Sequence, residues 1–88
     1  MLTIYKFSAA WCSPCKIVSK IWNEVVGSNQ SQGIKFIAID IDDDPDCAIK
    51  YNIQSIPTVI FEKDGEVIDT LCGTFKKNDF VSMISKHS

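Results

Sequence analysis

The chain has 88 residues, 45% of them hydrophobic, with a formal net charge of −2 and nine lysines but no arginine. This length supports one hydrophobic core, so we expect a single domain over residues 1–88, and scattered lysines without arginine argue against nucleic-acid binding. No apolar run approaches the roughly 20 residues of a membrane helix, and the first residues lack the basic segment of a signal peptide. We therefore expect a cytoplasmic protein that does not bind membranes.

A strand and then a helix are predicted at the start of the chain. The apolar run at residues 2–7 indicates a buried strand. Residues 12–26 follow as an amphipathic helix, because its apolar residues recur at helical spacing: Val18, Ile21, Trp22 and Val25. We expect Gly27 to end this helix and residues 28–33 to form a polar loop.

Two cysteines one helical turn apart, Cys12 and Cys15, stand where this strand meets this helix. A CxxC at such a junction is typical of a thiol–disulfide redox motif, because the helix N-terminus stabilises a thiolate at Cys12. We expect Cys12 to be exposed on the first turn and Cys15 to be buried. A zinc site would need a second pair of ligands. The remaining candidates, Cys47, Cys72 and His87, stand alone, so we predict no metal.

The second half of the chain predicts a strand, a short helix, a hairpin and a last helix. Residues 34–41 are apolar enough for a central strand. A short helix should run from Pro45 to about Tyr51, with Asp44 as its cap. Segments 58–62 and 66–71 flank the turn Lys63-Asp64-Gly65 and predict a hairpin. The last helix should span residues 77–86, with Phe80, Val81 and Ile84 facing inward and with His87 frayed.

Several separated motifs in this order resemble the thioredoxin family. They are Phe7-Ser8-Ala9 before Trp11-Cys12-Ser13-Pro14-Cys15-Lys16, then Asp40, Asp42, Pro45, Ala48, Lys50 to Ile53, Ser55-Ile56-Pro57-Thr58, Phe61, Gly65-Glu66 and Gly73. The resemblance implies an α/β class and a minimal thioredoxin fold, in which three helices flank a four-stranded mixed sheet of order 2-1-3-4. It also implies that the Ile56–Pro57 bond is cis. The family's extra N-terminal strand and helix have no counterpart here, and Ser13 stands where a glycine is usual.

The resemblance further implies a protein-disulfide reductase that cycles between a Cys12/Cys15 dithiol and a disulfide, with no other cofactor. Disulfide-containing proteins would be its substrates, and a thioredoxin reductase or glutathione would be its electron donor. We expect a monomer. The expected substrate-binding residues are Trp11, Ser13, Pro14, Ile56, Pro57 and Gly73. Two alternatives remain: a glutaredoxin-like reductase coupled to glutathione, and a binding subunit of a larger assembly whose redox activity is incidental.

Lys6 is the least family-like position of the chain, because it stands where thioredoxins carry a buried acid. Two interpretations follow. Lys6 lies under Cys15 and assists the loss of its proton, or its stem carries the ammonium out to the surface. The second is favoured, because an unpaired buried ammonium is costly and Ala38, which aligns with the lysine that often pairs with that acid in the family, offers no partner. Cys72 also has two interpretations: it is a third reactive thiol, or it is a small apolar residue at the end of a strand.

Overall fold

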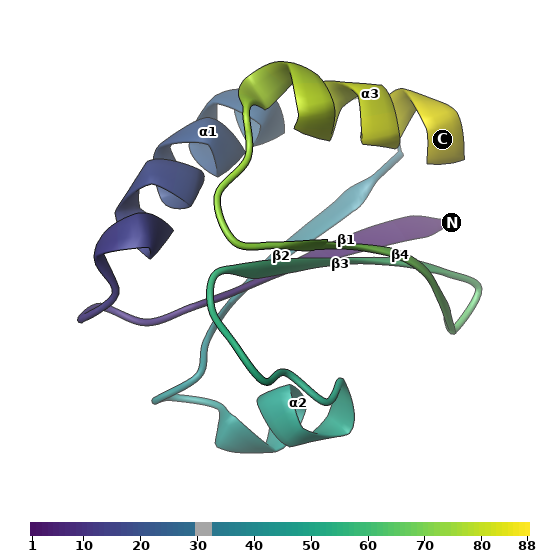
Figure 1. Ribbon diagram of the computed structural model, residues 1–88. Helices are drawn as coiled ribbons and strands as arrows, with labels where there is room; N and C mark the ends of the chain where they lie inside the picture. Colours follow the sequence, from purple (N-terminus) through teal and green to yellow (C-terminus); the bar gives the residue numbers. More distant parts are fainter. Residues whose placement is uncertain (30–32) are drawn as a thin grey trace.

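The computed structural model describes residues 1–29 and 33–88 and contains one mixed sheet covered by helices on both faces (Figure 1). The elements in chain order are β1 (Leu2–Ser8), α1 (Ser13–Asn29), β2 (Lys35–Asp40), α2 (Pro45–Lys50), β3 (Thr58–Lys63), β4 (Glu66–Cys72) and α3 (Lys77–His87). Helices α1 and α3 lie on one face of the sheet and α2 lies on the other. Within the described ranges, no helix combines the length and hydropathy that a membrane span requires.

The sheet has the strand order β2-β1-β3-β4, which confirms the order inferred from the family resemblance. Strand β1 is parallel to β2 and antiparallel to β3, and β3 is antiparallel to β4. Strand β2 therefore lies at an edge, and the prediction that its apolar sequence places it centrally is wrong. Strand β1 pairs with one side of β2, and no strand of the described residues pairs with the other side.

Helix α1 continues to Asn29, so the prediction that Gly27 ends it is wrong. A glycine inside a helix costs about 1 kcal/mol relative to alanine, which local packing can offset. A Cβ atom at Gly27 would meet only open space, whereas the side chain of Val25, two residues earlier, is fully buried and that of Trp22 nearly so. The burial of that face carries the helix past the glycine. The predicted loop at residues 28–33 thus starts later, and its positions 30–32 lie outside the described residues.

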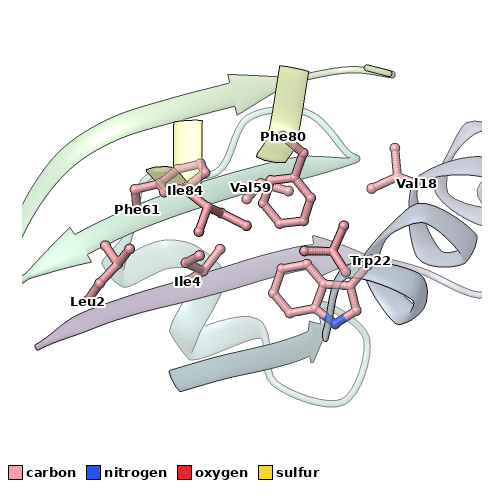
Figure 2. Close-up of a cluster of buried hydrophobic side chains, with 9 residues drawn as sticks. Leu2, Ile4, Val18, Trp22, Val59, Phe61, Phe80 and Ile84 are labelled. Atoms are coloured by element: carbon pink, nitrogen blue, oxygen red, sulfur yellow. The ribbon is translucent and has the colours of Figure 1, made fainter. Parts of the chain in front are cut away.

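The hydrophobic core fills the space between the sheet and the pair α1 and α3 (Figure 2). Phe80 is its centre, because its ring stacks on Trp22 at 5.8 Å and meets Phe61 edge-on at 6.0 Å. Ile84 of α3 is buried in the same cluster, as predicted. Val81 is 37% exposed, so the prediction that it faces inward is wrong. It follows Phe80 directly, and one residue turns a helix by about 100°, away from the sheet.

The start of helix α2 and the turn between β3 and β4 agree with the predicted cap and hairpin. The carboxylate of Asp44 accepts a hydrogen bond from the Cys47 backbone N–H at 3.1 Å, and Pro45 begins α2. Strands β3 and β4 are joined by Asp64 and Gly65 alone, both at positive φ, which is the arrangement of a type I′ hairpin turn. Each of these signals depends on only a few neighbouring residues.

Candidate active site

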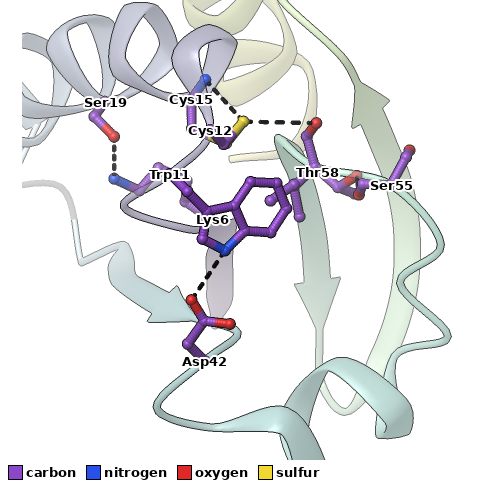
Figure 3. The surroundings of a disulfide bond; sticks show 9 residues. Lys6, Trp11, Cys12, Cys15, Ser19, Asp42, Ser55 and Thr58 are labelled. Carbon is purple, nitrogen blue, oxygen red and sulfur yellow. Dashed lines mark hydrogen bonds between the residues drawn. A yellow bond between two sulfur atoms is a disulfide. The ribbon is translucent and has the colours of Figure 1, made fainter.

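A disulfide joins Cys12 and Cys15 at the start of helix α1, with their Cα atoms 5.3 Å apart (Figure 3). After β1 the chain makes a turn that is closed by the Cys12 N–H donating to the Ala9 carbonyl at 3.2 Å. Helix α1 begins at the next residue, Ser13. Cys12 therefore occupies the N-terminal cap position. The Cys15 backbone N–H points at the Cys12 sulfur from 3.3 Å, as an unpaired first-turn amide does toward a capping acceptor.

Both sulfur-bearing residues are buried in the disulfide form, and the prediction that Cys12 is exposed is wrong. Cys12 is 6% exposed and Cys15 is 2% exposed. Together with Ala9 they form a small buried cluster against which Ile41 and Ile56 pack. The cover over Cys12 comes from these distant segments, which a helical pattern in the sequence does not reveal. The burial of Cys15 agrees with its predicted place on the inner face of the helix.

The segment Ile56–Pro57 packs against Cys12 and contains a cis peptide bond, as the family resemblance implied. The Ile56 carbonyl oxygen lies 4.0 Å from the Cys12 sulfur. In the disulfide this is a van der Waals contact, because the sulfur carries no proton, whereas a Cys12 thiol has one to donate. Gly73, at φ +81°, donates its N–H to the Pro57 carbonyl at 2.8 Å. Gly73 is therefore held beside this segment, next to the site as the family resemblance implied.

Trp11 is 68% exposed and forms part of the rim of the site. Its indole N–H donates to the Asp42 carboxylate at 3.0 Å, a contact that the sequence analysis missed. A signal for it does exist: β1 and β2 are parallel and pair Ser8 with Asp40, so the residues that follow both strands meet at one edge. Ser13 and Pro14 are exposed on the first turn of α1, also at this rim.

Lys6 is buried, with 7% exposure, and the favoured prediction that its ammonium reaches the surface is wrong. Its Nζ donates to the Ser19 hydroxyl at 2.8 Å (Figure 3). The same atom lies 5.7 Å from the centre of a Trp22 ring. Burial lowers the pKa of Lys6. A hydroxyl and an aromatic face on α1, neither of which the β1 sequence reveals, replace part of the hydration that the ammonium loses.

A cleft of about 510 Å³ opens beside Cys15, on the side away from the Ile56–Pro57 segment. It lies between α1 and the ends of β1 and β2, and its lining includes Ser8, Cys15, Lys16, Ser19, Lys20 and Asp40. The two cysteines therefore have different surroundings. Cys12 contacts a backbone carbonyl from a loop, and Cys15 borders a cleft whose lining includes two lysines.

The other titratable candidates lie outside this cluster. Cys72 is exposed at the end of β4, opposite Thr58, and Cys47 is half-buried on α2, where burial raises the pKa of its thiol. His87 is the last residue of α3 and its ring nitrogen contacts the Asp69 carboxylate at 2.9 Å, so the prediction that it is frayed is wrong. That contact, together with packing on Phe61, holds the helix end.

The family model described as Thioredoxin matches residues 1–86 of the chain. A thioredoxin from Staphylococcus saprophyticus is 34% identical over 86 residues, which cover 98% of this chain and 82% of that protein. A thioredoxin from Pyropia yezoensis is 40% identical over 81 residues, covering 92% of this chain and 75% of the relative. Among solved structures, a thioredoxin from Nicotiana alata is 30% identical with a TM-score of 0.88, covering 98% of this chain and 72% of that one.

These matches extend over nearly the whole chain and agree with the sheet order and with the disulfide at the start of α1. The chain therefore belongs to the thioredoxin family, and it is a thiol–disulfide oxidoreductase of the thioredoxin type that reduces protein disulfides.

Proposed function

We propose that Cys12 is the attacking cysteine of this reductase and that Cys15 is the resolving one. The observation that carries the proposal is the Cys15 backbone N–H, which points at the Cys12 sulfur from 3.3 Å at the first turn of α1. Unpaired amides and the helix dipole favour negative charge at this position. Thiolate is the reacting species in disulfide exchange, so the sulfur at the helix start is the better nucleophile.

The proposed cycle has two exchanges. The Cys12 thiolate attacks one sulfur of a substrate disulfide, forms a mixed disulfide and releases the second substrate thiolate. The Cys15 thiolate then attacks the Cys12 sulfur, which forms the Cys12–Cys15 disulfide and leaves the electron pair of the broken bond on the remaining substrate sulfur. Two electrons pass to the substrate in total, and two protons from water complete its thiols.

Docking of the substrate is assigned to the rim around Cys12. The backbone of Ile56 would bind an extended segment of substrate as an added strand, which the contact of its carbonyl with the Cys12 sulfur supports. Exposed Trp11 and Pro14 would supply apolar contact on one side. Gly73 would form the other side, held by its 2.8 Å hydrogen bond to the carbonyl of Pro57, whose own side chain is fully buried behind it.

The electron donor is proposed to be a thioredoxin reductase, with the cytoplasm as the working compartment. The relatives matched over most of their length are thioredoxins, which supports a thioredoxin reductase as the donor. Insulin disulfide reduction tests the donor. The reaction is driven by NADPH with thioredoxin reductase, by glutathione with NADPH and glutathione reductase, and by dithiothreitol as the positive control. Turnover with glutathione alone would instead assign the protein a glutaredoxin-like role.

The division of labour is tested by trapping. Cys15→Ser should accumulate a mixed disulfide with substrate at Cys12, because attack proceeds and resolution is lost. Cys12→Ser should not trap substrate and should not reduce insulin. Peptide mass spectrometry locates the adduct. An adduct at Cys15 of the Cys12→Ser protein, with none at Cys12 of the Cys15→Ser protein, would reverse the assignment.

A further inference from the structure

Lys6 is a buried cation without a counter-charge. It is 7% exposed, and its only hydrogen bond in the described residues is the one it donates to Ser19. No carboxylate of residues 1–29 and 33–88 lies within ion-pair distance of its ammonium. An ammonium has three donors, and burying it with one partner is costly in free energy. Methionine would fill a similar space at lower cost, so the charge itself calls for an explanation.

Ser19 connects this charge to the active site. It stands four residues after Cys15 on α1, hence one turn along the same side of the helix, and both residues line the cleft beside the disulfide. Its oxygen accepts the hydrogen bond from Lys6, which leaves the hydroxyl proton free to be donated. The Ser19 hydroxyl, which contacts the positive charge of Lys6, therefore lies in the lining of the same cleft as Cys15.

The charged groups around this cleft are predominantly positive. Helix α1 contributes Lys16 and Lys20, the end of β2 contributes Asp40, and β1 contributes Lys6 behind Ser19. Ser8 and Asn23 add polar lining without charge. A neighbouring positive charge favours the ionised form of a thiol, and the low dielectric around a buried charge strengthens that effect.

We infer that Lys6, acting through Ser19, is a positioning residue that stabilises the Cys15 thiolate for the second exchange. This inference rests on the proposed role of Cys15 as the resolving cysteine. In the mixed disulfide the Cys15 thiol releases its proton to water in the cleft. Its thiolate then forms the bond to the Cys12 sulfur while the bond from Cys12 to the substrate sulfur breaks. The electron pair leaves with the substrate thiolate, which takes up a proton from water.

The effect is reciprocal. Burial lowers the pKa of Lys6, and a thiolate formed at Cys15 would raise it again, because each charge favours the other. The disulfide form has no thiolate, so the buried ammonium is uncompensated there. In the dithiol and mixed-disulfide forms a Cys15 thiolate would supply the missing negative charge, and in the mixed disulfide it does so for the second exchange.

The test measures Cys15 alone, in the Cys12→Ser protein. The rate of iodoacetamide alkylation at Cys15 is followed against pH by peptide mass spectrometry, which separates it from Cys47 and Cys72. Adding Lys6→Met should raise the alkylation midpoint by about one pKa unit, a tenfold loss of thiolate below the midpoint. Lys6→Arg keeps the charge, so the Cys15 midpoint should stay close to its value in the protein with Lys6. Lys35→Met, at an exposed position of β2, is the matched control and should change nothing.

In the protein with both cysteines, Lys6→Met should slow resolution of the mixed disulfide about three- to fourfold at pH 7. The thiolate fraction falls tenfold, but the nucleophilicity of the less acidic thiol rises, with a Brønsted coefficient of about 0.4–0.5. Ser19→Ala should raise the Cys15 midpoint by a smaller amount in the same direction. Circular dichroism establishes that each variant is folded.

A folded Lys6→Met protein with an unshifted Cys15 midpoint would overturn the inference. If Lys6→Met does not fold, an unshifted midpoint in Ser19→Ala overturns it equally. These failures are separate from failure of the proposed function, which is read in the Cys15→Ser trapping experiment with Lys6 intact. Normal trapping at Cys12 with no effect of Lys6 or Ser19 would leave the two-step cycle standing and remove only the role of this pair.

Discussion

The described residues form two buried clusters, which differ in the kind of segment that packs over them. The larger lies between the sheet and helices α1 and α3, and large side chains such as Trp22 and Phe80 fill it. The smaller surrounds the disulfide and contains Ala9, Cys12 and Cys15. Exposure does not distinguish them, since the members of both are at most 6% exposed. What differs is the cover, which comes from regular elements in one and from loops in the other.

Hydrogen bonds hold the loops over the smaller cluster, among them the one from Trp11 to Asp42. Ile41 donates to the Ser8 carbonyl at 3.0 Å, and Gly73 donates to the Pro57 carbonyl at 2.8 Å. A net hydrogen bond contributes on the order of 1 kcal/mol to stability, less than the burial of one large side chain. The comparison suggests that the larger cluster maintains the fold while the smaller can open to admit a substrate sulfur. The following predictions test that division, from the largest expected effect to the smallest.

Phe80→Ala should have the largest effect on stability. Phe80 is fully buried and contacts three aromatic rings, so its loss should cost about 3–5 kcal/mol of the free energy of unfolding. The neighbouring Val81→Ala is the control, because an exposed site should change stability by only about 0.5 kcal/mol. Urea unfolding measures both. Equal costs at the two positions would mean that the larger cluster does not carry the fold.

Reduction of the disulfide should have a moderate effect. The cysteines are three residues apart, and the chain-entropy relation for so short a loop gives about 2 kcal/mol. We expect dithiothreitol to lower the free energy of unfolding by about this amount. The double variant Cys12→Ser with Cys15→Ser should show no response to dithiothreitol. A wild-type protein that is equally stable in both redox forms would show that the disulfide of the smaller cluster contributes nothing to the free energy of unfolding.

Asp69→Asn should have the smallest effect on stability. Asp69 contacts His87, which packs on Phe61 at the edge of the larger cluster. The hydrogen bond from His87 is the main cause that lowers the pKa of Asp69 below its ordinary 3.8. A lowered carboxyl pKa stabilises the fold above that ordinary value, and the contribution is lost as the pH falls through the folded value. We expect the variant to lose less than about 1 kcal/mol at pH 6, a difference that fades in acid. A difference that persists at pH 2 would rule out this ion pair as its source.

The sequence predicted most of the frame and the identity of the redox pair, because both depend on local patterns. Helical spacing located Trp22 in the core, and the strand–CxxC–helix order located Cys12 and Cys15. Three site features depend instead on contacts between distant segments: the burial of Cys12 under Ile56, the bond from Trp11 to Asp42, and the bond from Lys6 to Ser19. The parallel register of β1 and β2 could have suggested the second. The other two depend on tertiary packing that periodicity does not encode.

The pH dependence of alkylation at the two cysteines, compared within the reduced wild-type protein, tests the central claim most directly. Initial rates of iodoacetamide alkylation are measured separately at Cys12 and Cys15 by peptide mass spectrometry. The helix start should place the Cys12 midpoint below the value of about 8.5 for a free cysteine and below that of Cys15. A Cys12 midpoint at or above the free value, with Cys15 the lower of the two, would contradict Cys12 as the attacking thiolate.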